Sequence, residues 1–381
     1  MRHKSNVIKT IIGLAIGVFF VWLSASEWPL ERIVGSVSFS DGHVLVGGGF
    51  IPRTADDVAR LHGGVAGWTM ELFWLLPYLA ILIAIHYLRV IRWMPLLDPI
   101  VRLSFKEHNR IGAVGFMAMF LFPLRLGELV RPYLVKRATG SAARMTAVLA
   151  TVVVERVVDG LVVALILVAI LTQLPATDPS VALKLEVGAL AALAVFLGAT
   201  ILLLAARWKH ELARTVLKRT VGLISSKVAD AIDTLVGKFL TGLQRLPGKR
   251  ELAWFLFLTL VYWALNGLGV YCMARAFYLP VDAWGAYAMM CCVVVGMMIP
   301  NPPGNLGNFW YFLLLPVLLY GVTQDSTQAL AFGLAVWLLQ LLQQTAFGAW
   351  FILRRQVSWR GVVEATYEDE ETLSETEAAR V

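Results

Sequence analysis

The sequence predicts an all-α, polytopic helical membrane protein with two broken helical hairpins that re-enter the membrane. Of its 381 residues, 58% are hydrophobic and only 15% are charged, whereas about 25% of the residues of an average soluble protein are charged. Several apolar runs approach or exceed the ~20 residues that a helix needs to cross a bilayer. These runs are continuous rather than alternating in polarity, which argues against a transmembrane β-barrel.

The N-terminal part predicts one membrane span and a polar cap. An apolar run over residues 7–24 follows a short basic stretch at residues 2–4. Because this run is longer than the core of most signal peptides, we favour a retained signal anchor over a leader cleaved near residues 24–26. Residues 27–66 contain no long apolar run and are expected to form a small extracytoplasmic cap.

A second span is predicted over residues 68–88. It begins with aromatic residues, which commonly anchor helices at the membrane interface. Basic residues follow this span, and the positive-inside rule places them in the cytoplasm. They are Arg89, Arg92, Arg102, Lys106 and Arg110.

The first broken hairpin is predicted around residue 123. The apolar segment 111–122 is followed by Pro123-Leu124-Arg125-Leu126-Gly127-Glu128. This segment is too short to cross a bilayer as a helix. Basic residues lie on both sides of it, and those after the break are Arg131, Lys136, Arg137 and Arg144. We therefore expect the chain to enter the membrane from the cytoplasm and to return there.

The middle of the chain predicts two full spans and a basic helix. Residues 145–171 are expected to cross outward and residues 181–205 to cross back, because the loop between them lacks Lys and Arg. Residues 207–250 hold ten Lys or Arg residues, and their apolar positions recur every three or four residues. This pattern is typical of an amphipathic helix at the cytoplasmic face near anionic lipid headgroups. A cytoplasmic helix packed on the protein explains it equally well.

The C-terminal part predicts a span, a second broken hairpin and a last span. Residues 252–277 are expected to cross outward. The hairpin comprises residues 284–299, a Pro/Gly/Asn-rich loop and residues 309–320, and its flanks lack Lys and Arg, as expected outside the cytoplasm. The last helix, residues 327–353, ends at Arg354-Arg355 in the cytoplasm.

The two broken hairpins, entered from opposite sides, are typical of an inverted-repeat transporter whose binding site lies at the breaks. No residue-level repeat is visible, so this symmetry is an interpretation of the topology alone. Residues 1–353 form the predicted transmembrane domain, with both termini cytoplasmic. Residues 354–381 form a tail, and the seven acidic residues within 361–381 predict that it is disordered and solvated.

Charged residues inside predicted spans are the candidate binding residues. A charge at the bilayer centre costs roughly 2.5–3.5 kcal/mol on insertion scales, so such residues tend to be paired and to face a cavity. Glu155 and Asp159 share a helix face, and Arg156 can reach Asp159. The spacing of Arg125, Glu128 and Arg131 puts three charges on one side if this stretch is helical.

Two interpretations of these charges remain open. In the first, the arginines bind an anionic lipid headgroup while the carboxylates orient them, because a guanidinium donates two hydrogen bonds to a phosphate at once. In the second, the charges form an ion network that only locks helices together.

The loop of the second hairpin is a further candidate site. Its non-helical backbone needs protein or water partners at membrane depth. Its amides and glycines at Asn301, Gly304, Asn305 and Gly307 can contact a substrate. The alternative is a tight turn between two packed arms.

The remaining composition excludes several classes of site. The three cysteines lie in apolar segments without zinc or disulfide spacing, and we expect no metal or cofactor. No phosphate-binding loop of the Gly-x-x-x-x-Gly-Lys-Ser/Thr kind occurs, so ATP drive is not expected. Basic loops beside the membrane explain the net charge of +7 better than nucleic-acid binding does.

Three motifs in order resemble one family. The stretch Pro123–Glu128 with Arg131, then Glu155-Arg156 with Asp159, then Pro303-Gly304-Asn305-Leu306-Gly307, is similar to the transmembrane domain of lysylphosphatidylglycerol synthases. The resemblance covers about residues 7–353. It implies a flippase-like protein of the bacterial inner membrane that moves a lipid between leaflets, with the six charged residues taking part.

The chain departs from the family at the third motif. The family pattern resembles Pro-Gly-Gly-x-Gly-x-x-Glu, whereas this chain has Asn305 at the second Gly and Trp310 at the Glu. The soluble aminoacyl-transferring domain of true synthases is also missing, so lysine transfer is not expected.

Three functions are therefore considered. The first, which we favour, is a lipid flippase or transporter for an amphiphile with an anionic headgroup. The second is an enzyme acting on a lipid headgroup, with Glu128, Glu155 or Asp159 as the base. The third is a non-catalytic subunit or scaffold for a separate lipid-synthesising enzyme. Lysyl-phosphatidylglycerol, another phospholipid, an isoprenoid-linked sugar and a hopanoid all fit as substrate, and the oligomeric state stays open.

Overall fold

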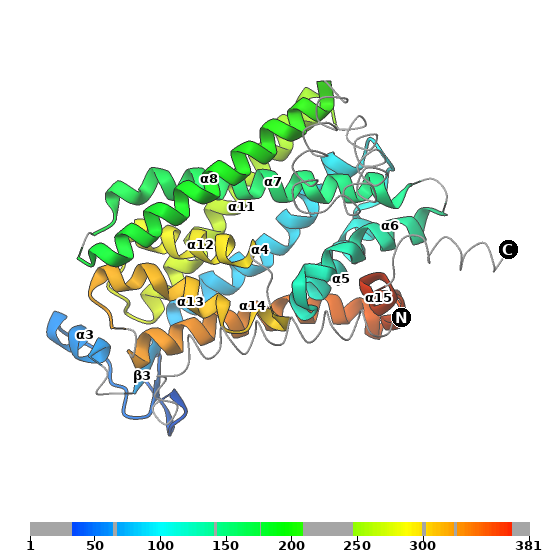
Figure 1. Cartoon of the computed structure of the whole chain (residues 1–381). Coiled ribbons are helices and arrows are strands. Elements are labelled where there is room, and N and C mark those ends of the chain that lie inside the picture. The colour runs from blue at the N-terminus through cyan, green and yellow to red at the C-terminus, as the bar shows by residue number, and fades with distance from the viewer. Residues whose placement is uncertain are drawn as a thin grey trace, which may run out of the picture.

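A computed structural model describes residues 33–63, 67–140, 143–175, 177–208, 247–298, 302–323 and 326–367. This part of the chain is a helical bundle with a small sheet at one end (Figure 1), so the predicted all-α membrane architecture is confirmed. Several predicted features lie wholly or largely outside the described residues. They are the first span, the basic helix, Asn301 and the end of the acidic tail.

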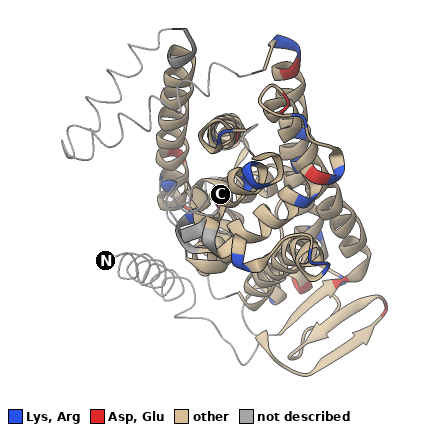
Figure 2. Cartoon of the chain, turned by 90° about the vertical axis from the view of Figure 1, so that its right-hand side faces the viewer, with Lys and Arg blue, Asp and Glu red and all other residues tan. Residues whose placement is uncertain are grey.

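Four described helices are long and apolar enough to cross a membrane. They are α4 (Leu72–Leu97), α8 (Pro179–Trp208), α11 (Lys249–Ala276) and α14 (Thr327–Leu353). Helix α7 (Met145–Ile170) is as long as α4 but carries Glu155, Arg156 and Asp159. Charged positions are sparse along most of the bundle (Figure 2).

The prediction that the second span ends at residue 88 is wrong. Helix α4 runs on to Leu97, and Arg89 and Arg92 belong to it rather than to a cytoplasmic loop. Arg92 is completely buried. The helix tolerates this charge because carboxylates of α7 lie against it and neutralise it.

The predicted cap is a folded unit at one end of the bundle, opposite α6 (Val130–Thr139) and α15 (Trp359–Tyr367) in Figure 1. It contains an antiparallel sheet and a short helix. These elements are β1 (Val37–Ser40), β2 (His43–Val46), α3 (Ala55–His62) and β3 (Trp68–Glu71). Residues 68–71, predicted to begin the second span, are therefore a strand.

Gln328 of α14 fixes the cap to the bundle. Its amide accepts a hydrogen bond from the backbone N–H of Thr69 at 2.9 Å. It donates to the carbonyls of Thr69 and Phe277, both at 2.6 Å. Its side chain is fully buried, so it joins β3 to the end of α11 where water cannot compete.

The first broken hairpin consists of α5 (Phe105–Leu121), the 3₁₀ segment η1 (Pro123–Leu129) and α6. Helix α5 begins six residues earlier than the apolar segment predicts, because Ser104 and Glu107 form a capping box. It ends at Leu121, and Phe122 is extended because the residue before a proline disfavours the helical conformation.

The second broken hairpin consists of α12 (Ala283–Met298), η4 (Pro303–Asn305), α13 (Asn308–Leu314) and η5 (Leu315–Tyr320). Gly304 and Gly307 have φ of +68° and +81°, which L side chains rarely adopt. Asn305 has φ of +55°. Asn tolerates this left-handed conformation better than most residues, so it is a workable replacement for glycine there.

The breaks of the two hairpins contact each other, since η1 packs against η4 and α5 packs against η4. Helix α14 runs along both hairpins and touches α5 and α13. One apolar core joins α4, α7, α11, α12 and α14, and a second joins α4, α5, α6 and α7. The interrupted backbones therefore meet inside the bundle, between these two cores.

We expect the substitution Gln328→Leu to detach the cap. It leaves one N–H and two carbonyls buried without a partner, and each unsatisfied group costs about 1–3 kcal/mol. Limited proteolysis of the purified protein should then cut between residues 33 and 71 faster than in the wild type. The control Gln356→Leu changes an exposed glutamine three residues beyond the other end of α14. Equal cleavage of the two variants would contradict the role of Gln328.

Candidate functional site

Glu155 of α7 is the centre of a buried ion cluster. Its carboxylate accepts hydrogen bonds from Arg92, Arg131 and Arg156, each at 2.8 Å. Glu155 and Arg92 are 0% exposed and Arg131 is 1% exposed. Three arginines thus surround one carboxylate that has no access to water.

Asp159, one turn further along α7, completes the cluster. Both of its oxygens accept from Arg92, at 2.5 and 2.8 Å, which is the bidentate geometry favoured by a guanidinium. Trp263 of α11 donates to the same carboxylate at 3.0 Å. Arg156 lies 3.4 Å from it, which confirms that Arg156 can reach Asp159.

Aromatic rings and one glycine shape the cluster. The guanidinium of Arg92 lies 4.3 Å from the centre of the Tyr262 ring, and that of Arg131 lies 5.0 Å from the ring of Trp93. Such stacking stabilises desolvated cations. A Cβ at Gly115 of α5 would lie only 2.4 Å from the Arg131 side chain, so glycine is required for α5 and α6 to approach here.

The prediction that Arg125, Glu128 and Arg131 act together on one side is wrong. Arg125 and Glu128 form their own ion pair at 2.9 Å in η1 and keep 24% and 20% of their side chains exposed. Arg131 belongs to α6 and points into the Glu155 cluster instead. The change from 3₁₀ to α-helix at residue 130 separates the two groups.

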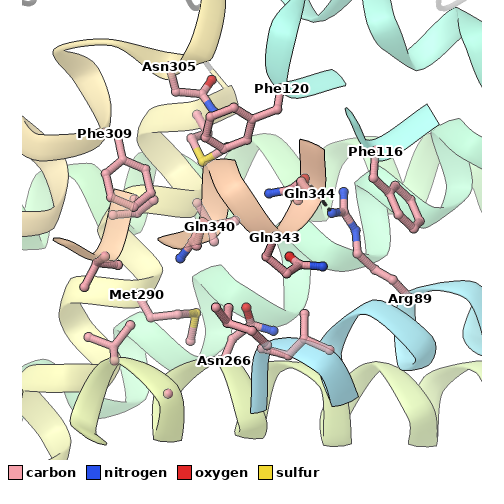
Figure 3. Close-up of a pocket in the computed structure, with 18 of the residues that line it drawn as sticks. Arg89, Phe116, Phe120, Asn266, Met290, Asn305, Phe309, Gln340, Gln343 and Gln344 are labelled. Atoms are coloured by element: carbon pink, nitrogen blue, oxygen red, sulfur yellow. Dashed lines mark hydrogen bonds between the residues drawn. The ribbon is translucent and has the colours of Figure 1, made fainter. Parts of the chain in front are cut away.

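A cavity adjoins the cluster, between α4, α5, α11, α12 and α14. Its interior volume is about 140 Å³, and Arg125, Arg156 and Asp159 reach its wall. Its polar lining also includes Arg89, Asn266, Asn305 and three glutamines of α14. Figure 3 shows these glutamines in the middle of the site, with Asn266 on one side and Asn305 on the other.

Arg89 differs from the arginines of the cluster. Its guanidinium lies 3.8 Å from the centre of the Phe116 ring and donates to Gln344 over a long 3.4 Å. Among the described residues no carboxylate lies within ion-pair distance of it, and its Nε atom has no hydrogen-bond partner. The cavity wall therefore carries a cation that is still available to an anion.

The loop of the second hairpin reaches the site through Asn305. This residue is 1% exposed in the folded chain and lines the cavity. The carbonyl of Gly304 accepts a hydrogen bond from Trp337 of α14 at 2.7 Å. Gly304 and Gly307 shape the loop and are absent from the cavity wall as far as the structure describes it.

Arg89, Arg92, Gln340, Gln343 and Gln344 were missed by the sequence analysis. Arg89 and Arg92 were assigned to a loop, although a helix extended by two turns puts them on one face. The glutamines recur at i, i+3 and i+4 in an apolar helix, a spacing that predicts one polar stripe. In the described part of the chain, no group of His, Cys, Asp and Glu side chains forms a metal site.

We expect Arg92→Leu to destabilise the protein far more than Arg125→Leu. Removing Arg92 leaves two carboxylates partly uncompensated in the interior, and breaking a buried ion pair costs about 3–5 kcal/mol. The pair of Arg125 is partly exposed and is expected to be worth about 1 kcal/mol or less. Thermal unfolding in detergent measures the loss of stability of both variants relative to the wild type. Similar losses of stability would contradict the assigned role of the cluster.

Comparison with known proteins agrees with the motifs. Residues 64–348 match the family described as the lysylphosphatidylglycerol synthase TM region, a match that includes all three motifs and the cavity and begins after the first predicted span. No curated protein gives a significant match. Because the family match covers most of the chain, this protein belongs to the lysylphosphatidylglycerol synthase transmembrane-region family.

Proposed function

We propose that this protein is a lipid flippase or transporter, which moves an amphipathic lipid with an anionic headgroup between the membrane leaflets. The observation that carries the proposal is a cavity between two broken hairpins, whose wall includes Arg89, an arginine without a carboxylate partner among the described residues. Family membership supports a membrane protein related to lipid handling. Discontinuous helices beside a buried polar cavity are a recurrent feature of transporter binding sites.

The charge of the site favours an anion. Five arginines (Arg89, Arg92, Arg125, Arg131, Arg156) lie in or beside the cluster, against three carboxylates (Glu128, Glu155, Asp159). A local excess of positive charge at membrane depth is costly by itself, and a bound phosphate offsets it. The structural interpretation of the charges accounts for Arg92 and Arg131 but leaves Arg89 unexplained.

The size of the cavity suits a headgroup rather than a whole lipid. About 140 Å³ holds several waters or a small polar group, whereas sites that enclose a drug-sized ligand span roughly 300–1,000 Å³. We infer that the acyl chains stay outside the bundle while the headgroup passes through. Exposed apolar side chains on α4, including Phe73, Leu76 and Ile83, are suited to contact with lipid chains.

We further propose an orientation in the bacterial inner membrane. Basic residues gather at one end of the bundle, and the cap lies at the other (Figures 1 and 2). These basic residues include Lys106 in the first turn of α5, Lys136 and Arg137 in the last turn of α6, and Arg354 at the C-cap of α14. By the positive-inside rule this end is cytoplasmic and the cap extracytoplasmic. The arrangement agrees with a cytoplasmic C-terminus.

We expect Arg89→Gln to slow lipid exchange without unfolding the protein. Arg89 holds no carboxylate in the described structure, so its loss removes a phosphate contact but no ion pair. A hydrogen bond to a charged group is worth about 1.5–3 kcal/mol, which is roughly a 10- to 100-fold loss in rate. The rate is measured as the exchange of phosphatidylglycerol between the leaflets of proteoliposomes.

The matched control is Arg354→Gln, which changes an exposed arginine stacked on Trp350. This variant should exchange lipid like the wild type. If the wild-type protein fails to accelerate the exchange of any native lipid, the transport proposal is wrong. That result would favour a role as a scaffold for a separate lipid-synthesising enzyme. If lipid headgroups are chemically altered instead, the protein is an enzyme.

A further inference from the structure

We propose that the cavity selects a phospholipid whose phosphodiester carries an uncharged, hydroxyl-bearing headgroup, such as glycerol or a sugar, and excludes headgroups that end in a protonated amine. This inference rests on the proposed transport function and names its substrate class. It follows from the hydrogen-bonding groups that the cavity leaves open and from the charges that it lacks.

A stripe of amides faces the unpaired arginine. Gln340, Gln343 and Gln344 lie on one side of α14 and point into the cavity, opposite Asn266 of α11 (Figure 3). Arg89 of α4 reaches toward the same stripe and donates to Gln344. A phosphate held by Arg89 would therefore have side-chain amides, rather than charges, beside its headgroup ester.

These amides have donors and acceptors left over. The Asn266 amide N–H donates to the carbonyl of Tyr262 at 2.7 Å, which leaves its own carbonyl oxygen open. The Gln344 carbonyl accepts from Arg89, which leaves its NH₂ open. Gln343 makes no hydrogen bond to any other residue that the structure describes. A hydroxyl both donates and accepts, and an amide offers the complementary pair of groups.

The cavity offers a protonated amine no free carboxylate. Asp159 is the carboxylate on the described wall, and both of its oxygens are occupied by Arg92. Glu155 is likewise occupied by three arginines. Trp310 fills the position of the acid in the family-like pattern, is buried, and packs against Trp337. An amine would instead meet Arg89, the wall arginine that has no carboxylate partner among the described residues, and two like charges repel each other.

The experiment compares two acyl-labelled lipids in sealed proteoliposomes that contain the full-length protein. One is phosphatidylglycerol, and the other is lysyl-phosphatidylglycerol, which adds amines to the same phosphodiester. We expect the wild type to exchange phosphatidylglycerol about tenfold faster, which corresponds to a difference of about 1.4 kcal/mol between the two headgroups.

The variant Gln343→Glu should reverse this preference, because it places a carboxylate in the cavity. It should slow the exchange of phosphatidylglycerol and speed that of the lysyl lipid. Gln343→Asn keeps the amide and should keep the preference. The control Gln356→Glu adds the same charge at an exposed position outside the cavity and should change neither rate.

Each failure points to a different error. Exchange of lysyl-phosphatidylglycerol at an equal or higher rate by the wild type overturns the selectivity while the transport function stands. An absence of exchange for both lipids and all other native lipids overturns the transport function, and this inference with it. Release of labelled glycerol phosphate trapped inside the vesicles would show a site for a soluble phosphate ester and would overturn the lipid assignment.

Discussion

The carboxylates of Glu155 and Asp159 must be neutralised in a medium that does not solvate charge, and the arrangement of the central helices depends on this constraint. Arg92 joins α4 to α7, and Arg131 joins α6 to α7. Trp263 joins α11 to α7 through its hydrogen bond to Asp159. Each contact replaces water that these groups would bind outside a membrane. A helix displaced by one turn would leave a charge unpaired, so the cluster also fixes the register between helices.

The two interrupted backbones are tolerated inside the bundle because protein groups surround them. The breaks at η1 and η4 expose polar backbone groups that lipid cannot satisfy. They meet each other beside the cavity, where Trp337 satisfies the carbonyl of Gly304. Arg125 and Glu128 pair within the first break. The interrupted helices, the buried charges and the cavity therefore lie in one region of the bundle.

The arginines of the site fall into two groups, those held by carboxylates and Arg89, which has no carboxylate partner in the described part of the chain. Arg92, Arg131 and Arg156 are held by carboxylates, so their charge is already used for folding. Arg89 stacks on Phe116 and faces uncharged amides. The binding interpretation drawn from the sequence named Arg125, Arg131 and Arg156, whereas the binding proposal now depends on Arg89, which the sequence did not single out. Trp310, which stands where the resemblance led us to expect an acid, packs against Trp337.

Local chemistry in the sequence determined most of the helices. Apolar length set α7, α8, α11, α12 and α14 to within a few residues, and prolines set both breaks, because these effects act within one segment. The sequence also identified Glu155, Arg156 and Asp159 as a connected group, since i, i+3 and i+4 neighbours share a helix face. Only the tertiary structure decided that Arg92 completes this group, that Arg131 joins Glu155 rather than Glu128, and that no described carboxylate pairs with Arg89. Arg92 and Asp159 are 67 positions apart, and Arg89 and Gln344 are 255 apart. Such contacts depend on which helices pack together, which no single segment determines.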